Sequence, residues 1–382
     1  MQEQVVRWRR DLHRIPELGN HLPQTSKYVQ EVLSGIGIPY VTMVDGSGIL
    51  ATITGAGAGK TIALRADMDG LPISEEAPVS FKSTNGNMHA CGHDAHTAML
   101  LGAAKILSDH KADLKGTVKL IFQPGEEGPG GAKPMIKEGC LDGVDAVFGQ
   151  HIGCIMRDVE ESGKIIVTHG NAMACADSFK IKIIGHGAHG AMPESSIDPI
   201  SIAAQVINGI YMIKARNCPS VSPSVISVCT IHSGTASNII PRTAELEGTT
   251  RSVDIKTRNL LAARIEQVLK GICDANGASY EFDYVFGYDV TTNNPEMADL
   301  VIKSAKDLGM AEDVVPQLNP VMGAEDMSYF LNDVPGAYYF LSSVTYQDGQ
   351  VYGHHNSQFM LDETVFSKGV ALLLQIVSNY LN

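Results

Sequence analysis

The segment 88–97 (MHACGHDAHT) holds four side chains that commonly bind metal ions. Cys91 and His93 stand two positions apart, and Asp94 and His96 complete the group. A single histidine is more often structural than a ligand, so it is the density of the group that favours a metal site. A thiolate combined with imidazoles binds zinc, and less often manganese, cobalt or nickel. The segment therefore predicts a transition-metal site at the start of a helix.

Two adjacent glutamates, Glu126 and Glu127, lie in a glycine- and proline-rich segment directly after the predicted strand 117–122. Glutamates in a loop are usually just solvated. The carboxyl end of a strand, however, is where open α/β sheets place their ligands. Neighbouring carboxylates there can divide the chemistry, because one can bind a metal while the other accepts a proton from the attacking water.

Further polar side chains stand where other predicted strands end. His151 ends the apolar run AVFGQH, and His354 and His355 follow another predicted strand. Asp67 stands at the end of the strand pattern ALRAD, and Asp69 follows it by two residues. Each is weak evidence alone. Together they predict one site along one edge of a sheet.

The glycine-rich segment 55–61 (GAGAGKT) does not predict a nucleotide site. A P-loop requires glycine where Thr54 stands, and it requires a helix after the loop, whereas the residues that follow (TIALRAD) are typical of a strand. We expect a hairpin turn here.

The first part of the chain alternates helical and strand patterns, as an α/β domain does. The predicted helices are 3–14, 24–36 and 95–107, and the predicted strands are 49–54, 61–66 and 117–122.

The pattern changes near residue 175, where a half-buried strand begins with alternating apolar and lysine residues. The order from there is βαββαβ, the split βαβ arrangement of an independent α+β domain. Its predicted elements are strands 178–184, 224–232, 243–251 and 279–286, and helices 198–216 and 256–275. The sequence therefore predicts an α/β domain of residues 1–173 and 288–382, into which an α+β domain of residues 174–287 is inserted.

Composition restricts the class of protein. The 382 residues carry a formal net charge of −13, which argues against nucleic acid as a partner because phosphate binding needs a basic surface. The polar residues 1–17 contain no apolar segment typical of a signal peptide, and the sequence predicts no membrane span of roughly 18–20 apolar residues. Seven cysteines, an odd number without CxxC pairing, fit a reducing compartment, so we expect a cytoplasmic protein without a membrane partner.

The chain resembles the aminoacylase and hippurate hydrolase family of dinuclear metallo-amidohydrolases, which is related to plant auxin-conjugate hydrolases and zinc carboxypeptidases. The resemblance covers nearly the whole chain. It rests on RRDLHRIPELG, ALRADMDGLPI, MHACGHDAHTAMLLGAAKIL, FQPGEEGPGGA, GHGAHGAMPESSIDPI, SGTASNIIP, LEGTTRS, GAEDMSYF and HHNSQFMLDE, in this order.

The resemblance implies an α/β/α sandwich catalytic domain and an inserted ferredoxin-like lid and dimerisation domain, hence a homodimer. It also implies two divalent metal ions (Zn, Mn, Co or Ni), with Glu126 as general base and Asp69 as a residue that steadies the ligands. His355 is preferred to His354 because the family's ligand lies four residues before a phenylalanine, here Phe359. The implied metal ligands are Cys91, His93, Glu127, His151 and His355, and the implied substrate-binding residues are His189, Asn238 and Arg251.

By the same resemblance the chain hydrolyses the amide bond of N-acyl amino acids, such as N-acetyl amino acids. Two positions depart from the family pattern: GAEDMS has methionine in place of phenylalanine, and QHIGCIM differs from the usual continuation. Both bear on substrate choice. A dipeptidase or carboxypeptidase acting on short peptides remains an alternative, as does a non-catalytic metal-binding regulatory protein.

Overall fold

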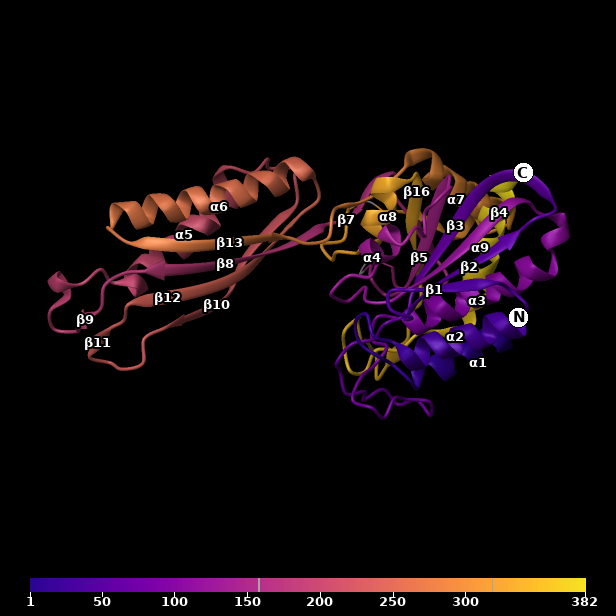
Figure 1. Cartoon of the computed structure of the whole chain (residues 1–382), viewed down its shortest axis with the longest axis horizontal. Coiled ribbons are helices and arrows are strands. Elements are labelled where there is room, and N and C mark those ends of the chain that lie inside the picture. The colour runs from indigo at the N-terminus through magenta and orange to yellow at the C-terminus, as the bar shows by residue number, and fades with distance from the viewer. Residues whose placement is uncertain (157–158, 318) are drawn as a thin grey trace. The chain divides into compact units, whose positions relative to one another are not determined.

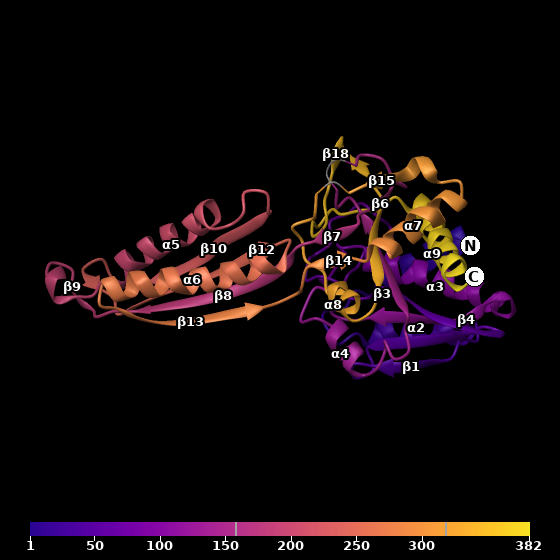
Figure 2. The same cartoon turned by 90° about the horizontal axis from the view of Figure 1, so that it is seen from above.

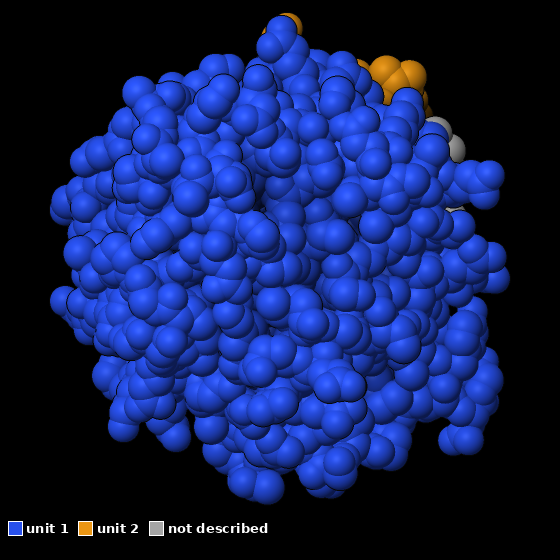
Figure 3. All heavy atoms as spheres, turned by 90° about the vertical axis from the view of Figure 1, so that its right-hand side faces the viewer, with its two compact units in different colours: residues 1–172, 291–321, 326–382 blue, residues 173–290, 322–325 orange. Residues whose placement is uncertain are grey.

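The computed structural model describes residues 1–156, 159–317 and 319–382 and is drawn in Figure 1. The chain forms two separately packed units. The first consists of Met1–Ala172, Thr291–Val321 and Asp326–Asn382, and its atoms form one continuous body on the face that Figure 3 shows. The second consists of Met173–Val290 and Met322–Glu325.

The first unit is built on a mixed eight-stranded sheet with the order β1-β2-β4-β3-β5-β16-β6-β15. The four central strands β4, β3, β5 and β16 are parallel, so their carboxyl ends lie along one edge. The strands are β1 (Tyr40–Met43), β2 (Gly48–Thr54), β3 (Gly57–Asp67), β4 (Lys115–Gln123), β5 (Ala146–Gly153), β6 (Ile165–Val167), β15 (Val314–Pro316) and β16 (Gly336–Ser342).

Helices cover both faces of this sheet, which confirms the predicted α/β/α sandwich. On one face α3 and α9 pack on β3, with α1, α2 and α7 beside them, and on the other α8 packs on β5 and β16 next to α4. These helices are α1 (Gln2–His13), α2 (Pro23–Gly35), α3 (His93–Asp109), α4 (Ala132–Lys137), α7 (Pro295–Asp307), α8 (Met327–Asp333) and α9 (Phe366–Leu381).

Helix α3 is buried on almost every side, as its apolar sequence predicted. Its Gly102 lies between α1 and α9, because a Cβ there would come within 2.8 Å of Val5 and 3.0 Å of Val370. This close packing fixes the helix that begins at His93, and so fixes the position of that side chain.

The predicted hairpin turn at residues 55–61 is wrong. Strands β2 and β3 are not neighbours, because β4 lies between them and pairs with both. The glycines instead allow close approach to the start of β4, since a Cβ on Gly59 would lie 2.9 Å from the backbone nitrogen of Gly116. The residues around 55–61 cannot indicate that β4, which begins more than fifty residues later in the chain, inserts between β2 and β3.

The segment Glu363–Leu381, which includes α9, is the one described helix long and apolar enough to span a membrane, with a mean hydropathy of 1.2. The sequence-based expectation overlooked it. In the structure, Leu373, Ile376 and Val377 of this helix are buried in the core of the first unit. The hydropathy of α9 is therefore that of a core helix.

The second unit has the predicted order βαββαβ and the antiparallel sheet order β10-β12-β8-β13. Burial alternates along β8, and α5 and α6 cover the buried face of the sheet (Figure 2). Asp198 caps α5 by accepting a hydrogen bond from the backbone N–H of Ile200, at 2.9 Å. The elements are β8 (Cys175–Ile184), α5 (Pro199–Arg216), β10 (Ser224–Ser233), β12 (Thr243–Ser252), α6 (Ile255–Ala275) and β13 (Ser279–Phe286), with a small pair β9 (Ala188–His189) and β11 (Ile239–Ile240).

Candidate metal and active site

Asp69 holds the two adjacent glutamates in place. Its two carboxylate oxygens accept hydrogen bonds from the backbone N–H groups of Glu126, at 2.9 Å, and Glu127, at 3.0 Å. Gly125, with φ of +70°, begins the turn. Consecutive residues of an extended chain would point to opposite sides, so this turn is what allows both glutamates to face one site.

Cys91 and His93 meet these glutamates at the N-terminus of α3. The Nε2 atom of His93 lies 3.9 Å from Glu126 Oε2 and 4.0 Å from Glu127 Oε1. Donor atoms of Cys91, His93 and Glu127 all lie within 4.8 Å of one another. Gly92, with φ of +92°, turns the chain between Cys91 and His93, and a Cβ there would lie 3.1 Å from the side chain of Ile152.

His151 approaches the same cluster from the end of β5. Its Nε2 lies 3.5 Å from Cys91 Sγ, while its Nδ1 lies 3.0 Å from the carbonyl oxygen of Ile152. Donation from Nδ1–H to that carbonyl leaves a lone pair on Nε2, the tautomer that a metal-binding histidine needs.

His355 reaches the cluster from the loop after β16. Its backbone N–H donates to the carbonyl of Ala90 at 2.9 Å, and its Nε2 lies 3.1 Å from Glu127 Oε1. The structure thus brings together the five side chains that the resemblance implies as ligands, from four separate segments of the first unit.

The electrostatics of the cluster favour bound cations. Burial, together with Glu127 and Glu126, raises the pKa of the Cys91 thiol well above its usual value. Burial lowers the pKa of His93, but Asp67 and Asp69 outweigh it and raise that pKa to about 10. The raised pKa of His93 reports the negative charge of the surrounding carboxylates, which also adds to the effect of burial on Cys91 and which divalent ions would offset.

Unsatisfied polar atoms point to the same conclusion. Nε2 of His93 and both ring nitrogens of His354 are buried without a hydrogen-bond partner among the described residues. Buried polar atoms are rarely left unbonded. The sulfur, nitrogen and oxygen donors present fit zinc, manganese, cobalt or nickel.

Two members of the 88–97 group do not face this cluster. Asp94 is buried away from it, with Oδ2 2.7 Å from both Arg9 Nε and His13 Nδ1. His96 uses both ring nitrogens, since Nδ1 lies 2.5 Å from Asp67 Oδ1 and Nε2 accepts from the backbone N–H of Ile152. Both residues therefore support the cluster.

Sequence reasoning missed Asp326 as a functional residue, although GAEDMS was part of the resemblance. Its carboxylate accepts hydrogen bonds from Arg65 at 2.9 Å and from Gln123 at 2.8 Å. It also accepts from the backbone N–H groups of Gly131 and Ala132. Asp326 thus ties the end of the glutamate loop to the sheet beneath it.

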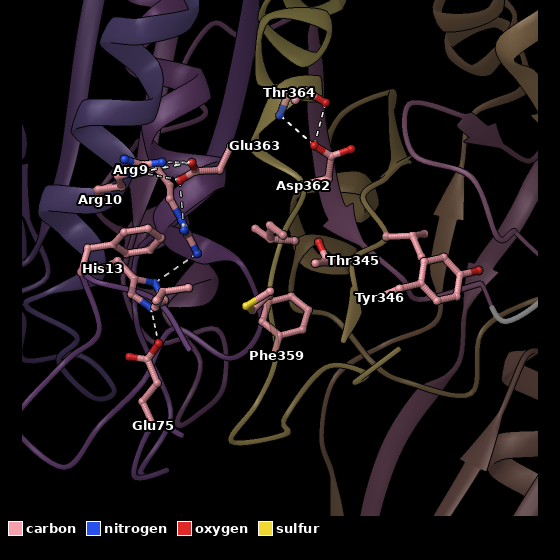
Figure 4. A pocket seen from close by; sticks show the side chains of 15 residues that line it. Arg9, Arg10, His13, Glu75, Thr345, Tyr346, Phe359, Asp362, Glu363 and Thr364 are labelled. Atoms are coloured by element: carbon pink, nitrogen blue, oxygen red, sulfur yellow. Dashed lines mark hydrogen bonds and ion pairs between the residues drawn. The ribbon is translucent and has the colours of Figure 1, made fainter. Parts of the chain in front are cut away.

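A cavity of about 510 Å³ lies in the first unit between α1 and residues 344–364 (Figure 4). Its wall includes the buried ion pair of His13 and Glu75, at 2.9 Å. None of the residues predicted for the site lines it. Phe359 does, and its ring centroid lies 4.7 Å from that of His354, so the cavity adjoins the cluster without containing it.

The three predicted substrate-binding residues all belong to the second unit. His189 and Asn238 are neighbours there, since His189 pairs with Ile239 across β9 and β11 and the N–H of Gly190 donates to the carbonyl of Asn238 at 2.8 Å.

Arg251 lies apart from them. It is next to the last residue of β12, whereas β11 leads into the first residue, Thr243. The strand from Thr243 to Arg251 spans roughly 26 Å at about 3.3 Å per residue. His189 and Arg251 of one chain are therefore at opposite ends of the second unit's sheet.

Comparisons with known proteins identify the family of the chain. The model of peptidase family M20/M25/M40 matches residues 63–379. Thermostable carboxypeptidase 2 of Saccharolobus solfataricus is 44% identical over 97% of this chain and 93% of its own length. N-acyl-L-amino acid amidohydrolase of Geobacillus stearothermophilus is 43% identical over 76% of this chain and 78% of its own length. The crystal structure of Bacillus subtilis YXEP, described as a dinuclear metal binding peptidase, superposes with a TM-score of 0.85 at 32% identity, covering 100% of this chain and 98% of that one. The resemblance seen in the sequence is confirmed, and the chain belongs to peptidase family M20/M25/M40.

Proposed function

We propose that the protein hydrolyses the amide bond of N-acyl amino acids, releasing a carboxylic acid and a free amino acid. One observation carries the proposal: the carboxylate of Asp69 turns Glu126 and Glu127 towards a single cluster of sulfur and nitrogen donors. One glutamate can then bind a metal while its neighbour moves protons. The Geobacillus relative, named for this activity, supports the same class of substrate.

Two divalent ions would be held by the five convergent side chains, and zinc, manganese, cobalt or nickel suits these donors. When bound, such ions lower the pKa of water and polarise the substrate carbonyl. The ligands would be Cys91, His93, Glu127, His151 and His355.

Glu126 would act as general base and then as general acid. Its carboxylate takes a proton from the attacking water and later gives a proton to the leaving amine. Its Oε2 lies 3.9 Å from His93 Nε2, which places the carboxylate beside the proposed ligands. Asp69 keeps this carboxylate in position by accepting a hydrogen bond from the backbone N–H of Glu126.

His189 would stabilise the oxyanion that develops on the carbonyl. Arg251, with Asn238, would bind the free carboxylate of the amino-acid half through charge-assisted hydrogen bonds. Because His189 and Arg251 of one chain are separated by roughly the length of β12, a single small substrate could contact both only if they came from different chains. The separation supports a homodimer that pairs through residues 174–287.

We further propose that the protein works in the cytoplasm. All seven cysteines are free, which suits a reducing compartment.

A carboxypeptidase or dipeptidase acting on short peptides is the second candidate, and the 44% identity to the Saccharolobus carboxypeptidase favours it. Such an enzyme would need the same carboxylate clamp and the same base. The two candidates differ only in the group on the other side of the amide bond.

A substrate screen separates the candidates. Protein loaded in turn with Zn²⁺, Mn²⁺, Co²⁺ or Ni²⁺ is given acetyl-, benzoyl- and peptidyl-amino acids, with Glu126→Gln protein as the blank. Each substrate is paired with its C-terminal amide, which lacks the charge that Arg251 would bind. Selective turnover of acyl amino acids with free carboxylates supports the proposal. Selective turnover of peptides favours the carboxypeptidase, and metal binding without any turnover favours a regulatory protein.

A further inference from the structure

His354 turns its side chain inwards, towards the proposed ligands. Its ring centroid lies 5.1 Å from that of His151, and one donor atom from each of Cys91, His151 and His354 lies within 4.8 Å of the other two. The next residue, His355, faces Glu127 instead. Two consecutive histidines thus approach different parts of one cluster.

The ring of His354 has no hydrogen-bond partner among the described residues, although Nδ1 and Nε2 are both buried. His151, and His96 whose ring centroid lies 4.7 Å from that of His151, each use at least one ring nitrogen to bond the backbone of Ile152. An imidazole that is buried without a partner loses the hydrogen bonds that it would make to water, and this loss destabilises the fold. A ligand that takes up its lone pair would offset that loss.

The backbone is shaped to accept this ring. Gly153, two residues after His151, has φ of +131°, and a Cβ at this position would lie only 2.2 Å from His354 Nε2. A larger residue would push the imidazole away from the cluster. The glycine at the end of β5 therefore leaves room for the His354 ring.

We propose that His354 is an additional metal ligand, serving the ion that Cys91 and His151 hold; this rests on the proposed dinuclear site. Cys91 then belongs to two sets of ligands, one completed by His93 and Glu127 and the other by His151 and His354. Because a thiolate can donate to two ions at once, each set can bind one ion. His355, beside Glu127, belongs to the first set.

The competing explanation is that His354 only fills space against Phe359, whose ring centroid lies 4.7 Å away. In that case a side chain of similar size without a suitable donor would leave the metal site unchanged. The two explanations therefore differ in metal binding, and they can be separated without an activity measurement.

The test uses full-length protein stripped with chelator and titrated with Co²⁺. The visible d–d bands and the sulfur-to-cobalt charge-transfer band report the ligands, and elemental analysis reports the number of ions. Wild type is compared with His354→Leu and His354→Gln, and with His110→Leu as a matched control, since the side chain of His110 is 68% exposed. Circular dichroism confirms folding, and the glutamine variant, with its polar side chain, serves if the leucine variant does not fold.

We expect wild type and His110→Leu to bind two ions with the same spectra. The His354 variants should bind one ion normally and the second at least about tenfold more weakly, with altered d–d bands. Unchanged affinity and spectra in a folded His354 variant would overturn the proposal and leave the proposed function intact. Failure of wild type itself to bind Co²⁺ would instead overturn the dinuclear site, and the inference with it.

Discussion

The Oδ1 atom of Asp69 accepts a hydrogen bond of 2.9 Å from the backbone N–H of Glu126, joining the end of β3 to the loop that follows β4. The neighbouring N–H of Glu127 is bound by the other oxygen of the same carboxylate. The aspartate therefore acts on the backbone of the glutamates, and their side chains remain available for chemistry.

The first prediction concerns Asp69→Asn. The amide keeps the size of the carboxylate but has only one acceptor oxygen, so one buried N–H loses its partner at a cost of about 1–3 kcal/mol. We expect a fall in unfolding free energy of that size, together with a fall in kcat because Glu126 is no longer held. Urea unfolding and steady-state kinetics measure the two effects. Asp109→Asn, whose carboxylate is 56% exposed, is the control and should change neither.

The second prediction separates Glu126 from Glu127. Glu126→Gln should keep both metal ions and the substrate affinity, and should lose about 10²–10⁴-fold in rate because only proton transfer is removed. Glu127→Gln should lose metal as well as rate. Elemental analysis and turnover of the two variants decide the assignment. If Glu126→Gln loses metal while Glu127→Gln retains it, the two roles are reversed.

The third prediction concerns Cys91. Burial and the carboxylates of Glu127 and Glu126 raise the pKa of its thiol, so the metal-free protein carries a protonated thiol at neutral pH. Metal uptake must release this proton, and metal affinity should therefore rise with pH. Cys91→Ser should bind metal more weakly and remain folded. Calorimetric titrations in several buffers at pH 6–9 measure both effects.

Peroxide provides a check on the same residue. It should inactivate the metal-free form of the wild type faster than the loaded form, because a bound ion shields the sulfur. Full activity of chelator-treated, metal-free protein would contradict the role of Cys91 and of the whole cluster.

The fourth prediction concerns pH and Asp94. Burial raises the pKa of this carboxyl, but Arg9 and His13 outweigh burial and hold its pKa well below the usual range. A group with a depressed folded pKa stabilises the fold above its unfolded pKa of about 4, and this contribution is lost as pH falls below that value. Asp94→Asn should therefore cost about 3–5 kcal/mol at pH 6.

The difference between wild type and Asp94→Asn should shrink towards pH 3. Denaturant unfolding at both pH values measures it, with Asp113→Asn as the control because that carboxylate is 80% exposed. A difference that stays constant with pH would contradict the assignment of the depressed pKa to Asp94.

The fifth prediction tests the homodimer by complementation. Glu126→Gln and His189→Ala proteins should each be nearly inactive. After subunit exchange, a mixed dimer contains one site with both wild-type residues only if His189 serves the partner's cluster. Statistical mixing should then restore about a quarter of the wild-type rate per site. No recovery in exchanged dimers, or a monomer by light scattering, would exclude action across subunits.

The sequence alone determined what depends on neighbouring residues. Asp198 followed by proline predicted the start of α5, and alternating apolar residues predicted β8. Capping and side-chain periodicity act over a few residues, so they are visible in the sequence. The types and order of the proposed metal ligands were also readable in the sequence, because the donor chemistry belongs to the side chains themselves.

Only the tertiary structure decided where those side chains face. The sequence lists Asp94 beside His93 and His354 beside His355, yet members of each pair lie in different surroundings. The position of β4 between β2 and β3 in the sheet likewise could not be predicted from any local sequence pattern. Contacts such as that of Asp69 with the glutamate loop join segments distant in the chain. They form because the parallel strands share one edge of the sheet, and no pattern within either segment encodes them.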